Sequence, residues 1–223
     1  MMTPAQLRND VDQFITTLFA ERLAIDGNPV LLLESPGEAM ITWSNETTLS
    51  DLFDLQSTWD EYIETMRRRW FSVVLWDGAY LQCTYTFSGA RLTKHRLCYF
   101  PCPISFTQAE ASRLTIEEMM LLLEDNELRN RLRLEGPLRF DFDQGAGTVD
   151  HPPVHLTISR KCCRIPVSYP LSVGHFVRFV FAHFYPDQYN ASSLIREWNC
   201  ATWGRCLPAV GDDAIFLDWR RSL

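Results

Sequence analysis

Lysine is nearly absent from this chain, because only Lys94 and Lys161 occur among its 21 basic residues and arginine supplies the rest of the positive charge. The net charge is −7 and the pI is about 5.2, which excludes a protein that coats nucleic acid through an overall basic surface. Arginine suits planar, bidentate recognition of carboxylate or phosphate. We therefore expect nucleic acid to bind only through a local arginine patch.

Long apolar runs are also lacking. Segments such as residues 30–33 fall far short of the roughly 20 residues that span a bilayer, and the N-terminus does not show the basic-then-apolar order of a signal peptide. We expect a cytoplasmic protein with no membrane partner. The seven cysteines are an odd number at irregular positions without a Cys-x-x-Cys pair, so we expect reduced thiols and no zinc ribbon.

The common cofactor and hydrolase motifs are missing as well. The chain has no phosphate loop, no Gly-x-Gly-x-x-Gly and no Gly-x-Ser-x-Gly, so no cofactor is expected. No Gly/Ser linker, low-complexity stretch or charge block marks a domain boundary. With 46% hydrophobic residues, the 223-residue chain can bury a core of its own, so we expect a single domain.

The spacing of apolar residues predicts an α+β fold, in which an antiparallel meander packs against amphipathic helices. An N-terminal helix is expected over residues 3–26, since apolar residues recur at helical spacing after the Thr3-Pro4 start. The clearest β signal is a meander over residues 70–100, in which Asp77-Gly78 predicts a two-residue type I′ hairpin. Strands are also expected near 30–33 and 40–43, and helices over 50–69 and 115–129. A C-terminal hairpin and helices are expected over 131–200, with the last two helices at 172–184 and about 190–198.

Two segments in the C-terminal half alternate apolar and polar residues, as half-buried strands do. The first covers residues 131–143 and the second covers residues 154–159. We expect them to pair as an antiparallel hairpin, in the register that places Asp143 opposite His155. On the polar face of this hairpin and in its loop lie the candidate catalytic residues, which are Arg139, Asp141, Asp143, His151 and His155.

Three interpretations of this polar face stay open. The cluster could carry out general acid/base chemistry, in which a carboxylate orients an imidazole and an arginine stabilises negative charge. The two histidines and an aspartate could instead bind a divalent metal, although Pro152-Pro153 between the histidines excludes the helical spacing of zinc proteases, and no metal ligand is assigned. The third interpretation is a solvated sheet face with cross-strand charge pairs.

Several motifs in the same half resemble a widespread family of short bacterial proteins of unknown function. They are LRFDFD at residues 138–143, HPPVHL at 151–156 and CRIPV at 163–167, followed by a helix that ends at Phe184-Tyr185-Pro186. A weaker match is YFPCP at residues 99–103. The resemblance implies a bacterial cytosolic accessory or toxin-like role, associated with mobile elements and defence islands, and it carries over no catalytic residue.

Two functions from different classes follow. The first is an interaction protein, an accessory subunit of a defence or toxin–antitoxin type system or a homo-oligomer, which binds a protein partner through rigid aromatic anchors. The alternative is a small nuclease or phosphodiester-processing toxin that uses the Arg/Asp/His cluster. The aromatic anchor candidates are Trp198, Trp203, Phe216 and Trp219.

Overall fold

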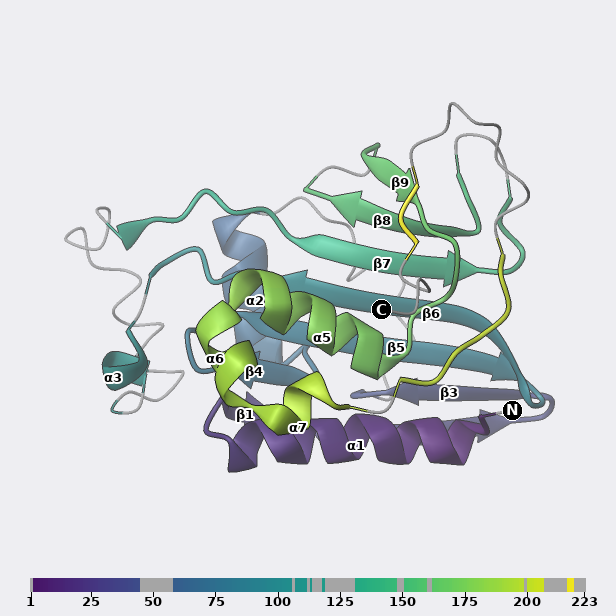
Figure 1. Cartoon of the computed structure of the whole chain (residues 1–223), viewed down its shortest axis with the longest axis horizontal. Helices are drawn as coiled ribbons and strands as arrows, with labels where there is room; N and C mark the ends of the chain where they lie inside the picture. Colours follow the sequence, from purple (N-terminus) through teal and green to yellow (C-terminus); the bar gives the residue numbers. More distant parts are fainter. Residues whose placement is uncertain are drawn as a thin grey trace.

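The computed structural model describes residues 2–44, 58–105, 107–111, 113, 118, 131–147, 151–159, 162–198, 200–206 and 216–218. In this part of the chain, helices pack against a nine-stranded antiparallel sheet, which confirms the α+β expectation (Figure 1). The strands are β1 (Ala24–Gly27), β2 (Leu31–Ser35), β3 (Glu38–Thr42), β4 (Val73–Leu75), β5 (Tyr80–Ser88), β6 (Arg91–Phe100), β7 (Leu138–Asp143), β8 (Val154–Ile158) and β9 (Arg164–Pro166). The helices are α1 (Pro4–Ala20), α2 (Trp59–Arg68), α3 (Gln108–Ala111), α5 (Val173–Phe184), α6 (Pro186–Ala191) and α7 (Ser193–Arg196).

The sheet is ordered β1-β4-β5-β6-β7-β8-β9, and every one of these pairs is antiparallel. The order branches at β5. One edge of β5 pairs with β6; on the other edge, the start of β5 pairs with β4 and its end pairs with β3, which in turn pairs with β2. The long strands β5 and β6 therefore form the centre, and β7, β8 and β9 extend the sheet on one side of it.

One face of the sheet carries the main hydrophobic core. α1 and α5 lie along this face in Figure 1, and their buried side chains join alternate residues of β5, β6 and β7 in a single apolar cluster. The ring of Phe140 on β7, for example, meets Phe176 and Phe179 of α5 edge-on, at centroid distances of 6.3 and 5.2 Å. Burial of this apolar surface, at roughly 25 cal/mol per Å², holds the helices to the sheet.

The opposite face is covered at one end by α2, which lies behind the sheet in Figure 1. Thr58 and Glu61 form a capping box at the start of α2, and Tyr62 of this helix packs near the stacked rings of Tyr80 and Phe100. The remainder of this face, over β6 to β9, is polar and carries the candidate site described below. None of the described helices combines the length and apolar character needed to cross a membrane.

Two sequence expectations in the first half of the chain, the end of the first helix and the type of the Asp77-Gly78 turn, are wrong in detail. α1 begins after Thr3 as expected, but it ends at Ala20 because Ala24–Gly27 pairs with β4 as strand β1. The Asp77-Gly78 turn is not type I′, since only Gly78 has a positive φ (+85°) and a type I′ turn requires it at both central residues. Four residues, 76–79, connect β4 to β5, and the amide of Gly78 donates to the carbonyl of Leu75.

The C-terminal half also departs from the expected pattern. Of the predicted strand 131–143 only β7 forms, and Leu132 and Leu134 are 53% and 102% exposed instead of lying on a buried face. Pro186 begins α6 as its first residue, so the expected helix at 190–198 is replaced by the shorter α6 and α7. α5 begins after its Ser172 cap as predicted. The expected helix at 115–129 and residues 50–57 of the one at 50–69 lie outside the described residues, apart from residue 118.

Candidate functional site

The polar face of β6, β7 and β8 brings several of the predicted residues together. β7 pairs with β8 so that Asp141, and not Asp143, lies opposite His155, which corrects the expected register by two residues. A shift of two keeps every side chain on the same face, because side chains alternate along a strand with a period of two. β6 extends this face, with Arg96 opposite Asp141 on the other side.

Asp141 is the centre of the cluster. Arg96 donates from Nε to Oδ1 of Asp141 at 2.8 Å, and Arg139 donates from Nε to Oδ2 at 2.5 Å. Burial alone would raise the pKa of Asp141, but the adjacent His155 and the two guanidinium groups outweigh burial and lower this pKa. Asp141 is thus ionised at neutral pH and is suited to hold cations in place rather than to accept a proton.

His155 is held between two oxygen acceptors. Its Nδ1 lies 2.9 Å from the carbonyl oxygen of Pro152, so this nitrogen carries a proton, because a carbonyl can only accept. Its Nε2 faces Oδ2 of Asp141 at 3.5 Å, and the side chain is only 3% exposed. With both nitrogens directed at protein atoms, His155 is suited to orient its neighbours and poorly placed to exchange a proton with a ligand.

His151 is more accessible and has different electrostatics. Its ring meets the ring of His155 at a centroid distance of 4.9 Å, at the end of the loop before β8. Burial lowers the pKa of His151, with Arg164 and His155 adding to the shift, although Asp141 and Asp143 oppose it. His151 is therefore neutral at neutral pH and can accept a proton.

Asp143 lies at the rim and is paired with Lys94, whose Nζ is 3.0 Å from Oδ2. The amide of Gly145 also donates to Oδ1 of Asp143, at 2.9 Å. Burial would raise the pKa of Asp143, but Lys94 and Gly145 reverse the shift, so the pKa is lowered. Asp143 thus fixes the turn after β7 and does not reach His155. The neighbouring residue of His151, Asp150, lies outside the described residues.

These side chains line a cavity of about 360 Å³ on the face of the sheet away from α5. Its lining includes four cationic side chains and two carboxylates, a surplus of two positive charges when the histidines are neutral. Arg164, on β9, was not a sequence candidate, and its Nε is buried without a hydrogen-bond partner among the described residues. The charged and imidazole residues of the lining are Lys94, Arg96, Arg139, Arg164, Asp141, Asp143, His95, His151 and His155.

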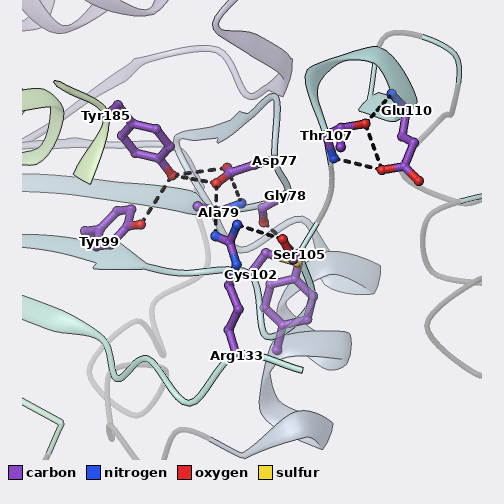
Figure 2. Close-up of polar contacts among 11 residues, drawn as sticks. Asp77, Gly78, Ala79, Tyr99, Cys102, Ser105, Thr107, Glu110, Arg133 and Tyr185 are labelled. Carbon is purple, nitrogen blue, oxygen red and sulfur yellow. Dashed lines mark hydrogen bonds and ion pairs between the residues drawn. The ribbon is translucent and has the colours of Figure 1, made fainter. Parts of the chain in front are cut away.

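A second polar cluster surrounds Asp77, and the sequence interpretation missed it because the Asp-Gly pair was explained by the turn alone (Figure 2). Asp77 is 3% exposed, and it accepts hydrogen bonds from the hydroxyl of Tyr185 at 3.0 Å and the amide of Ala79 at 3.1 Å. Arg133 lies 3.9 Å away, and Tyr99 contacts the Tyr185 hydroxyl at 3.2 Å. Burial raises the pKa of Asp77, with these partners opposing it. The cluster ties the β4–β5 turn to the end of α5, so we assign it a structural role.

His, Cys, Asp and Glu are the side chains that most often bind metal ions in proteins. Within the described ranges, no group of three or more His, Cys, Asp and Glu side chains is arranged to hold a metal ion. The seven cysteines are free thiols, three of them buried.

Comparison with protein families places the chain. A model of the uncharacterised conserved protein family DUF2290 matches residues 23–208. The chain belongs to this family. The match confirms the expectation of a conserved family without an assigned function, and it covers the N-terminal strands as well as the C-terminal half. No curated protein and no solved structure matches.

The matched range of this DUF2290 protein includes the whole polar cavity and two of the aromatic anchor candidates. Trp198 meets Phe14 edge-on at a centroid distance of 6.0 Å, so it packs against the protein's own core. Trp203 is half-buried beside Tyr85, at 6.3 Å. Phe216 is 36% exposed, and Trp219 lies outside the described residues.

Proposed function

We propose that the cavity over β6 to β9 binds a phosphate ester and that the protein processes phosphodiesters, with single-stranded RNA as the first substrate to test. The observation that supports this proposal is the surplus of cationic side chains in one cavity of a protein whose net charge is −7. Guanidinium groups match the geometry of phosphate oxygens. A local patch of this kind attracts an anionic substrate in spite of the overall acidity.

Arg164 is the proposed anchor for the phosphate. Its buried Nε has no partner among the described residues, and a buried donor without an acceptor costs free energy unless a ligand satisfies it. Its charge acts on His151 and, after burial, contributes to the lowered pKa of that side chain. A phosphate bound to Arg164 would thus lie beside a proton acceptor.

His151 is the proposed general base. It would take the proton from the ribose 2′-hydroxyl, whose oxygen then forms a bond to phosphorus while the bond from phosphorus to the 5′-oxygen breaks. The departing 5′-oxygen would take a proton from solvent, and the guanidinium groups would stabilise the added negative charge. Proton transfer by a positioned group contributes about 10²- to 10⁴-fold to a rate.

The test is cleavage of a fluorescent single-stranded RNA by purified wild type, His151→Ala and Arg164→Ala. Arg131→Ala is the matched control, because Arg131 is an exposed arginine that pairs with Glu110 outside the cavity. We expect cleavage by the wild type and the control and a loss of about 100-fold in both cavity variants, at unchanged melting temperature. Growth and total RNA integrity after inducible expression provide the cellular counterpart. A wild type that cleaves no RNA, or equal rates in all four proteins, would reject the proposal.

An accessory subunit of a defence or toxin–antitoxin type system is the second proposed function. It is favoured by exposed apolar side chains, namely Leu134 at 102% and Phe216 at 36%, which a protein partner could cover. The packing of Trp198 against Phe14 counts against Trp198 as an anchor. Pull-down from the native host should recover a partner with the wild type and less of it with Leu134→Asp. A monodisperse monomer that recovers no partner contradicts this function.

A further inference from the structure

We propose a second binding site in this protein: the groove between the tip of the β5–β6 hairpin and residues 202–206 binds a planar aromatic anion of the size of a nucleoside monophosphate. The groove has a volume of about 560 Å³. Small-molecule sites occupy about 300–1,000 Å³ and combine apolar walls with a few polar groups. The segment that forms one wall crosses the sheet beside the hairpin in Figure 1.

The floor of the groove is apolar and belongs to the main core. Leu92, Phe142 and Pro170 line it and are buried, and the half-buried ring of Trp203 forms a wall. An indole face of this kind stacks on other planar rings, which favours an aromatic ligand over an aliphatic one.

The wall is already in place without a ligand. The amide of Cys206 donates to the carbonyl of Ser168 at 3.0 Å, which ties the segment to the loop after β9. Trp203 lies beside Tyr85, and the hydroxyl of the fully buried Tyr85 donates to the carbonyl of Leu171 at 3.4 Å. A site whose walls are fixed in advance loses less conformational entropy when a ligand binds.

The charge of the groove has one sign. Arg91 and Arg205 are exposed and line it, and its described lining includes no carboxylate. Burial raises the pKa of Cys206 while the charge of Arg91 opposes the shift, so Arg91 on the hairpin acts across the groove on the 202–206 segment. The lining of the groove thus combines two arginines with an aromatic side chain, which is complementary to a ring that carries a negative group.

The groove and the phosphate cavity are separate sites. Phe142 lines both sites, but their charged side chains differ. The groove has Arg91 and Arg205, whereas the cavity has the carboxylates of Asp141 and Asp143 and the cationic residues Lys94, Arg96, Arg139 and Arg164. A substitution of a charged residue in one site should therefore leave ligand binding at the other site unchanged.

The test is calorimetric titration with adenosine 5′-monophosphate, with adenosine as the uncharged probe and glycerol 3-phosphate as the probe without a ring. Wild type, Arg205→Ala, Arg164→Ala and the control Arg131→Ala are compared. We expect the groove to bind the monophosphate alike in the wild type, Arg164→Ala and the control, and about tenfold more weakly in Arg205→Ala. Adenosine and glycerol 3-phosphate should each bind the groove more weakly than the monophosphate. The ligand should quench tryptophan fluorescence, and Trp203→Phe, which keeps a ring against Tyr85, should abolish that quenching.

Binding that is lost in Arg164→Ala and kept in Arg205→Ala would place the ligand in the phosphate cavity and overturn the groove site, while supporting the proposed function. Absence of binding to the wild type, or equal affinity for all three probes, would overturn the groove site as well. Loss of RNA cleavage in His151→Ala with unchanged groove binding would leave both sites supported.

Discussion

Arg139 and Asp141 lie two residues apart on β7, and Nε of Arg139 donates to the carboxylate of Asp141 at 2.5 Å. Residues two apart on a strand share a face, so the pair is local, and Arg96 joins it from the neighbouring strand. The side chains of Arg139 and Asp141 are 8% and 11% exposed. The carboxylate of Asp141 therefore neutralises guanidinium groups that are largely buried on the sheet.

Asp141→Asn should destabilise the fold by about 3–5 kcal/mol, because it leaves the buried Arg139 without a counter-charge. The matched control is Asp143→Asn, whose ion pair with Lys94 is half-exposed and should contribute within about 1 kcal/mol. Urea unfolding of both variants at pH 7 measures the difference. Equal losses in the two variants would mean that Asp141 does not organise the cluster.

His95 should make the protein lose stability as the pH falls below neutral. His95 is buried and accepts a hydrogen bond from the amide of Leu171 at Nε2, and burial lowers its pKa to about 3, with Asp141 opposing. In the unfolded chain the pKa is about 6.5. The contribution of His95 is therefore fully present above that value and is lost as the pH falls through it toward 3. Between pH 7 and pH 5 the loss should be about 2 kcal/mol.

His95→Gln tests this expectation, since an amide oxygen can still accept from Leu171 and does not titrate. Unfolding free energies of the wild type and His95→Gln, measured from pH 7 to pH 5, should converge as the pH falls. Parallel curves over that range would show that His95 takes up no proton on unfolding.

Asp77→Asn should leave the protein at least as stable at pH 7. Burial raises the pKa of Asp77, so its stabilising contribution is greatest at low pH and decreases as the pH rises from the unfolded value of about 3.9 through the folded value. An amide is neutral and keeps an oxygen for Ala79 and Tyr185. Thermal melting from pH 4 to pH 7 should give a flatter profile for the variant. Asp77→Ala, which removes both hydrogen bonds, should cost about 1–3 kcal/mol.

Gly136→Ala should destabilise the fold by crowding the segment that precedes β7. A Cβ atom at Gly136 would lie 1.9 Å from Oγ and 2.7 Å from Cβ of Ser159, whose φ is +55°. Overpacking of this kind costs about 1–3 kcal/mol. The double variant with Ser159→Gly should recover most of the loss, because glycine removes both atoms and adopts a positive φ without strain. No recovery in chemical denaturation would mean that the two residues do not meet.

The alternation of β7 was sufficient to predict that Arg139, Asp141 and Asp143 share a face, and this is confirmed. The register was not predictable, because it depends on the backbone bond from Asp143 to Pro153 at the start of the loop. An alternation pattern fixes which side a residue faces and not which residue it meets.

Arg96 and Arg164 were not predicted as members of the site, for different reasons. Arg96 lies in a strand that was predicted, but its pairing with β7 spans 45 residues of sequence and has no local signal. Arg164 lies in a strand of only three residues, which is too short to show a period. Helix starts with a Ser or Thr cap were predicted at Thr3 and Ser172, whereas the end of α1 depended on the pairing of β1 with β4.

The central claim is that the cavity around Arg164 binds phosphate esters, and binding of an RNA analogue that cannot be cleaved tests it most directly. A short 2′-deoxy oligonucleotide lacks the attacking hydroxyl, so calorimetry measures binding alone. We predict binding to the wild type and to Arg131→Ala, a loss of about tenfold in Arg164→Ala, and weaker binding as salt concentration rises. Equal affinity of the wild type and Arg164→Ala, or no binding to either, would contradict the account.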